Sequence, residues 1–333
     1  MDIIQIDSGF EQIPIERIDL QDKIFAVAYP QDVDEHLTAS VRDAGLFIPV
    51  VLESRQDRLF RIVSGGRRIP AAKAAGLNAV TARITGQGVG DKSLFLWNIR
   101  ENAAIRALNH MEKSLVLHRL TADFGAGEQE LLELMPLLGL EPARQVLYQY
   151  SGLARLNHEL RRYLIVHGIP VKVGSRMAAW SPADQDALCG FLRTVQMGGN
   201  TLNEVVELLE EIALRDRMKI ADVLMKRELR NVLQAPGFTS TQKKDRLKRG
   251  LIRMRYPGLW ERTQRISELL AKGGRVPGVT IEPPPYLEGI GLDVSFSFRS
   301  AGELRDKAER LAALSRQGEI GQVLSLLQQK EER

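Results

Sequence analysis

The sequence predicts a mainly α-helical α+β protein whose strands are confined to its two ends. Over residues 13–84, short β-branched runs alternate with helical segments. From Lys92 onward, apolar residues recur at helical spacing over most of the chain. Two further short strands follow a KGGRVPG segment near the C-terminus. We therefore expect a small mixed N-terminal domain, an all-helical middle domain and a small α+β C-terminal domain.

The N-terminal elements are marked by β-branched runs and by glycines that end helices. Helices over 34–44 and 67–75 are predicted to stop at Gly45 and Gly76, because glycine is the usual residue after a helix end. The predicted strands cover residues 13–18, 47–52, 59–63 and 80–84.

The remaining elements follow from periodicity. Val294, Phe296 and Phe298 alternate with serines, so one face of that strand should be buried. The predicted strands are 279–282 and 293–298. The predicted helices are 92–107, 111–123, 128–138, 142–153, 156–167, 182–197, 201–214, 218–234, 241–255, 257–272, 301–316 and 319–329.

Length and composition bound the function classes. At roughly 150 residues per domain, 333 residues suggest two or three domains. We predict domains over 1–110 and 111–214, a basic helical segment over 215–275, and a domain over 276–333. The single cysteine, Cys189, excludes a cysteine-cluster metal site and an intramolecular disulfide framework. No membrane-length apolar run and no cationic leader occur, so we expect a cytoplasmic protein without a membrane partner.

The net charge of +4 is unevenly distributed along the chain. Residues 1–124, 125–214 and 276–333 have net charges of −1, −4 and −2, whereas residues 215–275 carry +11. This excess predicts contact with the phosphate backbone of DNA, which is sequence-independent. A solvated helix face is the alternative. The densest cations are Lys243, Lys244, Arg246, Lys248 and Arg249, followed by Arg253 and Arg255.

Two segments of the N-terminal region have the residue types of an anion site. In Ser64-Gly65-Gly66-Arg67-Arg68, a strand ends in two glycines and a helix begins, so backbone N–H groups and guanidiniums converge. The alternative is a tight turn with two surface arginines. On a later helix, Glu101 and Asn102 are followed by Arg106, a set that can hold Mg²⁺ and a nucleotide. The alternative there is an ordinary polar helix face.

A third segment has the pattern of a helix-turn-helix. The helix over 128–138 is followed by Gly139-Leu140-Glu141-Pro142 and a second helix that Pro142 should begin. The second helix presents Arg144, Gln145, Tyr148 and Gln149, which can contact base edges or phosphates. Any helical hairpin is the alternative.

Taken in order, these stretches resemble the ParB/RepB-type family of DNA partition proteins. The matching segments are IPIERI, DVDEHLTASVRDAGLFIPVVL, FRIVSGGRRIPAAKAAGL and IRENAAIRALNHMEKSLVLHRLTADFG, with LIVHGIPVKVGSRMAAWSPADQDAL further on. The resemblance implies a ParB/sulfiredoxin-like N-terminal domain and a helix-turn-helix domain. It also implies a nucleoid-associated homodimer that binds duplex DNA, acts in plasmid or chromosome partition and works with a ParA-type ATPase.

The resemblance also assigns residues. It implies CTP and Mg²⁺ as ligands, with CTP switching a clamp on DNA. Gly65, Arg67 and Arg68 would hold the triphosphate, Glu101 the Mg²⁺ and Asn102 the nucleotide. Gly66 and Arg106 complete the implied nucleotide site, and Glu101 is the best candidate for a catalytic group. Arg144, Gln145, Tyr148 and Gln149 would lie on the recognition helix.

The chain departs from the family pattern at specific positions. Gly66 replaces the glutamate of the GERR-type motif, and Ile105 stands where EN-x-x-R has its arginine, with Arg106 one residue later. The predicted enzymatic activity is therefore at most a weak CTPase. Two alternatives remain open: a ParB-fold transcriptional or mobile-element regulator without nucleotide turnover, and a small-molecule kinase or nuclease on the same fold.

Overall fold

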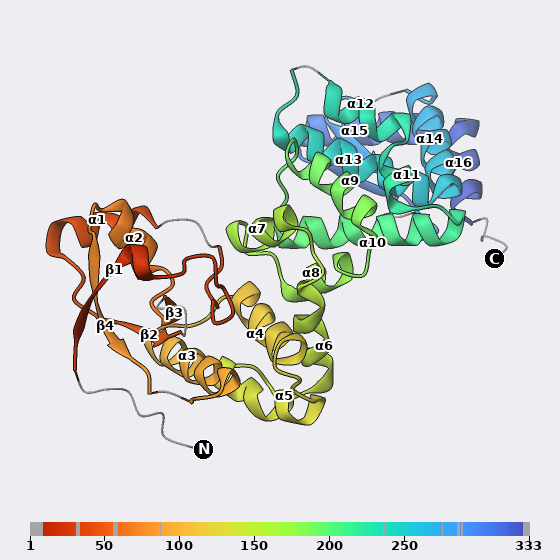
Figure 1. Ribbon diagram of the computed structural model, residues 1–333. Coiled ribbons are helices and arrows are strands. Elements are labelled where there is room, and N and C mark those ends of the chain that lie inside the picture. Colours follow the sequence, from red (N-terminus) through yellow and green to blue (C-terminus); the bar gives the residue numbers. More distant parts are fainter. Residues whose placement is uncertain are drawn as a thin grey trace. The chain divides into compact units, whose positions relative to one another are not determined.

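The computed structural model describes residues 9–30, 34–55, 59–86, 88–235, 237–274, 276–284, 287 and 289–328. The chain divides into two compact units, Met1–Val206 and Glu207–Arg333. The first contains a four-stranded sheet and the second a two-stranded sheet, so the strands lie near the two ends of the chain as predicted (Figure 1). The finer domain boundaries at 110, 214 and 275 stay predictions.

The first unit begins with a mixed sheet of strand order β1-β4-β2-β3. β4 pairs antiparallel with β1 and parallel with β2, and β2 pairs antiparallel with β3. The strands are β1 (Glu11–Pro14), β2 (Val50–Ser54), β3 (Phe60–Ser64) and β4 (Ala79–Ile84), with helices α1 (Glu35–Ala44) and α2 (Arg68–Ala74) between them.

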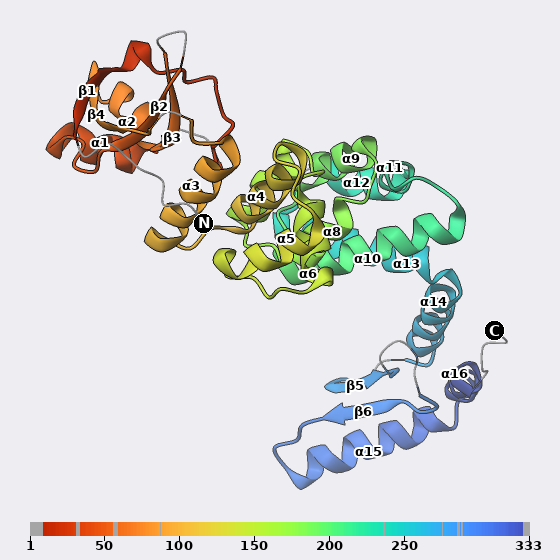
Figure 2. The same cartoon turned by 60° about the horizontal axis from the view of Figure 1, so that its bottom comes forward.

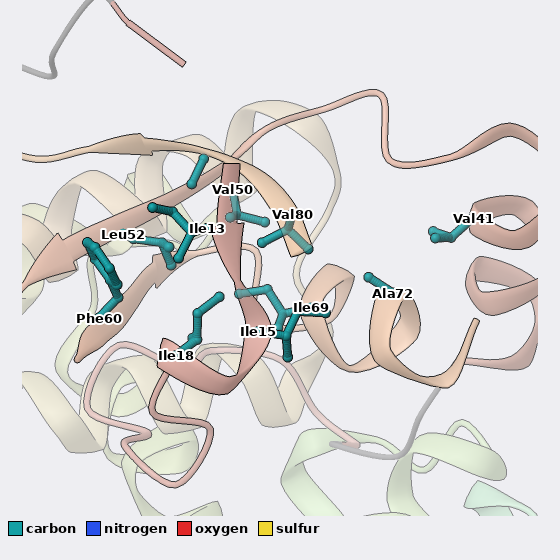
Figure 3. Close-up of a cluster of buried hydrophobic side chains, with 11 residues drawn as sticks. Ile13, Ile15, Ile18, Val41, Val50, Leu52, Phe60, Ile69, Ala72 and Val80 are labelled. Carbon is teal, nitrogen blue, oxygen red and sulfur yellow. The ribbon is translucent and has the colours of Figure 1, made fainter. Parts of the chain in front are cut away.

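The core of this sheet explains why these runs form strands. Val50 and Leu52 on β2 are fully buried and belong to one cluster with Ile69 and Ala72 of α2 (Figure 3). Because the parallel pairing of β2 with β4 requires a crossover, α2 is the element that connects the two strand pairs and covers the cluster. The predicted strand over 13–18 is only partly correct, because a 3₁₀ helix (Ile15–Arg17) replaces its second half.

Helices make up the rest of the first unit. The predicted helix over 182–197 ends earlier, at Leu192, and a seven-residue helix that the periodicity missed precedes it. The second helix of the predicted helix-turn-helix begins at Arg144, two residues after Pro142. The helices are α3 (Asp91–Ile105), α4 (His110–Ala122), α5 (Glu128–Leu134), a 3₁₀ turn (Met135–Leu138), α6 (Arg144–Leu153), α7 (His158–Val166), α8 (Val171–Met177) and α9 (Pro182–Leu192).

The second unit is helical, with one hairpin. The predicted single helix over 218–234 is two short helices, and helix α10 crosses the boundary between the units. The elements are α10 (Gly199–Asp216), α11 (Ile220–Leu224), α12 (Arg227–Gln234), α13 (Ser240–Arg255), α14 (Pro257–Lys272), β5 (Val279–Glu282), β6 (Asp293–Phe296), α15 (Ala301–Ser315) and α16 (Gly318–Gln328). Residue 329, the predicted end of the last helix, lies outside the described residues.

The C-terminal hairpin differs from the prediction in its burial. β5 and β6 pair antiparallel and form a sheet of their own (Figure 2). Val294 is 48% exposed and Phe298 is 52% exposed, so the predicted burial of their face is wrong within a single chain. The alternation of apolar residues with serines is present, but the described residues of this chain do not cover the apolar side chains of Val294 and Phe298. Within the described part of the chain, no helix is long and apolar enough to span a bilayer.

Candidate functional site

All seven residues predicted to bind a nucleotide line one cavity of about 340 Å³ in the first unit. They come from two regions that are distant in sequence: the turn between β3 and α2 with the first residue of α2, and the C-terminal end of α3 with the residue that follows it. The loop over 25–28 forms another wall of this cavity. The predicted residues that meet here are Gly65, Gly66, Arg67, Arg68, Glu101, Asn102 and Arg106.

The two glycines of the turn have different roles. Gly65 has a φ of +108°, and a Cβ built there would lie 2.5 Å from Cγ1 of Val50. Only glycine therefore fits between the turn and β2. At Gly66 an added Cβ would meet nothing within 4 Å. The N–H groups of Arg68 and Ile69 donate to the carbonyl of Gly65, so the amides of this turn that can face an anion are those of Gly66 and Arg67.

Arg67 presents its guanidinium at the cavity wall. It forms an ion pair with Asp34, which caps the N-terminus of α1 by accepting from the N–H of Leu37. That backbone hydrogen bond, together with Arg67, holds the pKa of Asp34 below its ordinary value. The arginine side chain is 46% exposed, so a ligand can reach it. Asp34 was not predicted from the sequence, although an aspartate just before a helical run is the pattern of an N-cap.

Arg68 is largely a brace rather than an open donor. Its Nη1 donates to the carbonyl oxygens of Ile48 and Pro49 at 3.0 and 2.8 Å, and its Nη2 donates to Ser64 Oγ at 3.1 Å. Burial lowers the pKa of this guanidinium, and the nearby carboxylate of Glu101 opposes that shift. Arg68 thus ties the loop before β2 to the end of β3.

Glu101 is held in place at the cavity by two partners. Its carboxylate accepts a hydrogen bond from Ser64 Oγ, and Arg68 Nη2 lies 3.6 Å from Oε1. The side chain remains 24% exposed. Among the described residues no cluster of three or more His, Cys, Asp or Glu side chains suits a metal ion. A cation at Glu101 would therefore complete its coordination with phosphate oxygens and water, which is how Mg²⁺ commonly binds with one carboxylate.

Asn102 is oriented by a buried asparagine, Asn98, which was not predicted from the sequence. Its Nδ2 donates to the Oδ1 of Asn98 at 2.7 Å, and Asn98 in turn donates to the carbonyl of Phe25 at 2.6 Å. The Oδ1 of Asn102 is thereby left as the acceptor available to a ligand. Asn98 precedes Asn102 by one helical turn, and that spacing was the available signal.

The Ile105-Arg106 departure has a structural explanation. Helix α3 ends at Ile105, and Arg106 adopts an extended conformation with φ −153° and ψ 157°. Arg106 therefore reaches the cavity wall although it is one residue late in the motif. Its guanidinium forms two 2.7 Å hydrogen bonds with the nearly buried carboxylate of Glu112 at the start of α4. Ile105 is 68% exposed.

The predicted recognition residues lie together on α6. Leu147, Tyr150 and Leu153 anchor the helix in the interior. Arg144, Gln145 and Tyr148 are exposed on the other side, and Gln149 is half-buried. The preceding turn contains Gly139 in the left-handed conformation. The apolar side of α6 packs into the interior and leaves its polar side exposed, as in a helix that enters the major groove of DNA.

The basic helix α13 uses several of its cations internally. Lys243 Nζ donates to the carbonyl of Leu233 at 2.9 Å, and Arg246 stacks over Phe238 with its guanidinium carbon 3.8 Å from the ring centre. Arg253 and Arg255 pair with Glu228 and Glu211 at 3.7 and 2.7 Å. Lys244 is half-buried, and Arg249 is exposed, although its Nε donates to the carbonyl of Asp245 at 3.4 Å. The surface therefore offers fewer open cations than the charge of the segment suggests.

The stretch of chain that forms most of this cavity is similar to a known protein family. The model of the ParB N-terminal domain matches residues 6–103, which contain six of the seven predicted cavity residues, and Arg106 lies just beyond the match. Residues 6–103 are therefore similar to the ParB N-terminal domain. The resemblance drawn from the motifs is confirmed for this part of the chain, as is the α+β, mainly helical fold class.

Curated relatives agree with this assignment. The probable chromosome-partitioning protein ParB of Vibrio cholerae is 29% identical over 130 residues, which are 39% of this chain and 42% of that protein. The probable plasmid-partitioning protein ParB of Thermus thermophilus is 33% identical over 102 residues, 30% of this chain and 33% of that protein. The chain thus spans less than half the length of these relatives.

Among solved structures, a C-terminally truncated chromosome-partitioning protein ParB from Caulobacter crescentus, in complex with CTP-γ-S, is 25% identical to this chain. The match covers 56% of this chain and 99% of that one, with a TM-score of 0.26.

Proposed function

We propose that this protein is a ParB-like DNA-binding protein of plasmid or chromosome partition, with CTP as the switch of a DNA clamp. The observation that supports the nucleotide part is the convergence of seven residues, predicted from two separate motifs, on one cavity, and six of the seven lie within the match to the ParB N-terminal domain. The relatives that share this domain are named as partition proteins.

The cavity residues divide the work of holding a triphosphate. Gly65 allows close approach of the turn to β2, and the amides beside it face the phosphates. Arg67 supplies the charge-assisted donor by exchanging Asp34 for a phosphate oxygen. Mg²⁺, if it accompanies the nucleotide, would be held by Glu101 and would offset phosphate charge.

Calorimetric titration tests this proposal. The protein should bind CTP in the presence of Mg²⁺. An Arg67→Ala variant should bind CTP at least about tenfold more weakly, since a hydrogen bond to a charged group contributes roughly 1.5–3 kcal/mol. Arg42, exposed on α1, is the matched control, and its alanine variant should bind like the parent. Equal weakening by both variants, or no heat with the parent, contradicts the assignment.

The DNA-binding part rests on two surfaces. We assign sequence reading to the exposed face of α6 and non-specific phosphate contact to α13. Binding of the parent to duplex DNA should weaken steeply as salt is raised, because phosphate contacts release counterions. A response that does not change between 50 and 200 mM salt would remove the claim of phosphate contact.

A regulator that binds CTP without turning it over is the second candidate, and Gly66 favours it. The turn has room for a side chain at this position but carries none, whereas the family motif has a glutamate there. Release of inorganic phosphate from CTP separates the two functions. Turnover that persists in Glu101→Gln would further show that Glu101 is not the catalytic group.

The hairpin of β5 and β6 supports a homodimer. A two-stranded sheet is marginally stable alone, and this one exposes Val294 of β6, with Phe298 exposed just beyond the strand. We assign a second copy of the chain as the partner, because a two-fold axis lets identical patches cover each other.

A ParA-type ATPase and a location on the nucleoid complete the proposed partition role. Stimulation of such an ATPase by the protein on DNA would test that part.

A further inference from the structure

One carboxylate holds two of the four residues assigned to DNA reading. Glu128, the first residue of α5, accepts a hydrogen bond from Tyr148 at 2.7 Å through Oε2. Its Oε1 lies 2.7 Å from Nε of Arg144. Each carboxylate oxygen therefore binds a different side chain of α6.

The position of this contact matters as much as its distances. Arg144 and Tyr148 are one helical turn apart and lie about 40° apart around the axis. The Arg144 side chain is 75% exposed, and Tyr148 is 60% exposed. Side chains this exposed would otherwise sample several rotamers. Glu128 thus fixes two residues on the outward face of α6, away from the side that Leu147 anchors.

We propose that Glu128 is a positioning residue that sets the specificity of α6, by neutralising Arg144 and orienting Tyr148 until a matching DNA site replaces it. This inference rests on the proposed DNA-binding function. It assigns a role to an acidic residue that neither the motifs nor the charge of the recognition helix indicated.

The physical argument compares two kinds of DNA partner. A lone phosphate must displace the carboxylate from Arg144 and remain near its negative charge, so the exchange gains little. A base edge such as guanine O6 and N7 accepts two hydrogen bonds from one arginine and lies in the groove rather than on the backbone. Glu128 therefore weakens non-specific binding more than specific binding, in keeping with the net charge of −4 over residues 125–214.

The contact itself can be tested without DNA. The hydrogen bond to Glu128 raises the pKa of the Tyr148 phenol, and the nearby Arg144 opposes that shift. In Glu128→Gln the carboxylate charge is lost, so the pKa of Tyr148 should fall toward its ordinary value. An NMR titration of the Tyr148 ring measures this change. An unchanged pKa in the variant overturns the inference while leaving the proposed DNA binding intact.

The role in specificity is tested on duplex DNA of random sequence. Glu128→Gln should bind more tightly than the parent at low salt. Its salt slope should steepen by about 0.9, one phosphate contact, so its advantage falls about three- to fourfold between 50 and 200 mM salt. Glu133→Gln is the control, because Glu133 carries the same charge on α5 and contacts Gln129 instead.

The outcomes separate the two proposals. Equal or weaker binding by Glu128→Gln, or the same change in both variants, overturns the role of Glu128 and leaves DNA binding in place. If neither the parent nor Glu128→Gln binds duplex at any salt, the proposed function fails, and this role fails with it.

Discussion

At the scale of single residues, the two neighbouring glycines provide the sharpest test of the nucleotide turn. Gly65→Ala forces a Cβ against Val50 and a left-handed backbone on alanine, which should destabilise the first unit by about 2–4 kcal/mol. Gly66→Ala should change stability by less than about 0.5 kcal/mol, because open space surrounds that position. Urea unfolding followed by circular dichroism measures both. Similar losses in the two variants would show that the turn is not packed as described.

The ion pair between Arg67 and Asp34 gives a second prediction at this scale. Asp34→Asn keeps the N-cap of α1 but removes the carboxylate that competes with phosphate. CTP affinity should rise about 1.4-fold to fivefold, because a partly exposed ion pair contributes roughly 0.2–1 kcal/mol. Calorimetry with Asp43→Asn, a charge change at an exposed position of the same helix, is the control. A lower affinity in Asp34→Asn would mean that Asp34 itself holds the nucleotide.

The residue types of the cavity were predictable, but their partners were not. Seven positions followed from local motifs, since a strand end followed by glycines and arginines is visible in the sequence. Asp34 and Asn98 gave only local signals, an N-cap pattern and a spacing of one helical turn, because their contacts with Arg67 and Phe25 span 33 and 73 residues of sequence. From the motif alone, Arg67 and Arg68 were expected to bind phosphate alike. In the structure, Arg68 instead donates to the carbonyl oxygens of Ile48 and Pro49 and so holds the loop before β2 in place.

At the scale of elements, the fold shows which patterns can be read from one sequence. Long amphipathic helices such as α10 and α13 were predicted nearly to their ends because many periodic positions support them. Helix α8 was missed, since seven residues offer less than two helical repeats. Its Gly174 lies against Leu153 and Leu164, a tertiary contact that no local propensity reveals.

Helix α13 gives the prediction that belongs to this scale. Replacing Lys244 and Arg249 with glutamine should lower the salt slope of DNA binding by about 1.8, two phosphate contacts. Replacing Arg253 and Arg255 should instead reduce the stability of the second unit, because both pair with glutamates of neighbouring helices. Salt titrations and thermal unfolding of both double variants distinguish these effects. If only the Arg253 and Arg255 replacements change the salt slope of DNA binding, Lys244 and Arg249 form a solvated helix face that does not contact DNA.

At the scale of the whole molecule, the small net charge conceals a division between the two units. The segment with the predicted reader of sequence is acidic, and the basic excess lies mainly on helices of the second unit. DNA reading and backbone affinity are thus expected to be separable by mutation. The variants at Glu128 and on α13 test the two contributions independently.

The C-terminal hairpin carries the last prediction, which concerns the state of assembly. Val294 on β6 is 48% exposed and Phe298, two residues beyond β6, is 52% exposed, and a second chain that covers them would remove both from water. Phe298→Asp should therefore convert a dimer into a monomer, measured by light scattering coupled to gel filtration. Leu214→Asp is the control, because Leu214 is 82% exposed on α10 and lies outside the hairpin. A dimer that survives Phe298→Asp, or dissociates equally in Leu214→Asp, would place the contact between copies elsewhere.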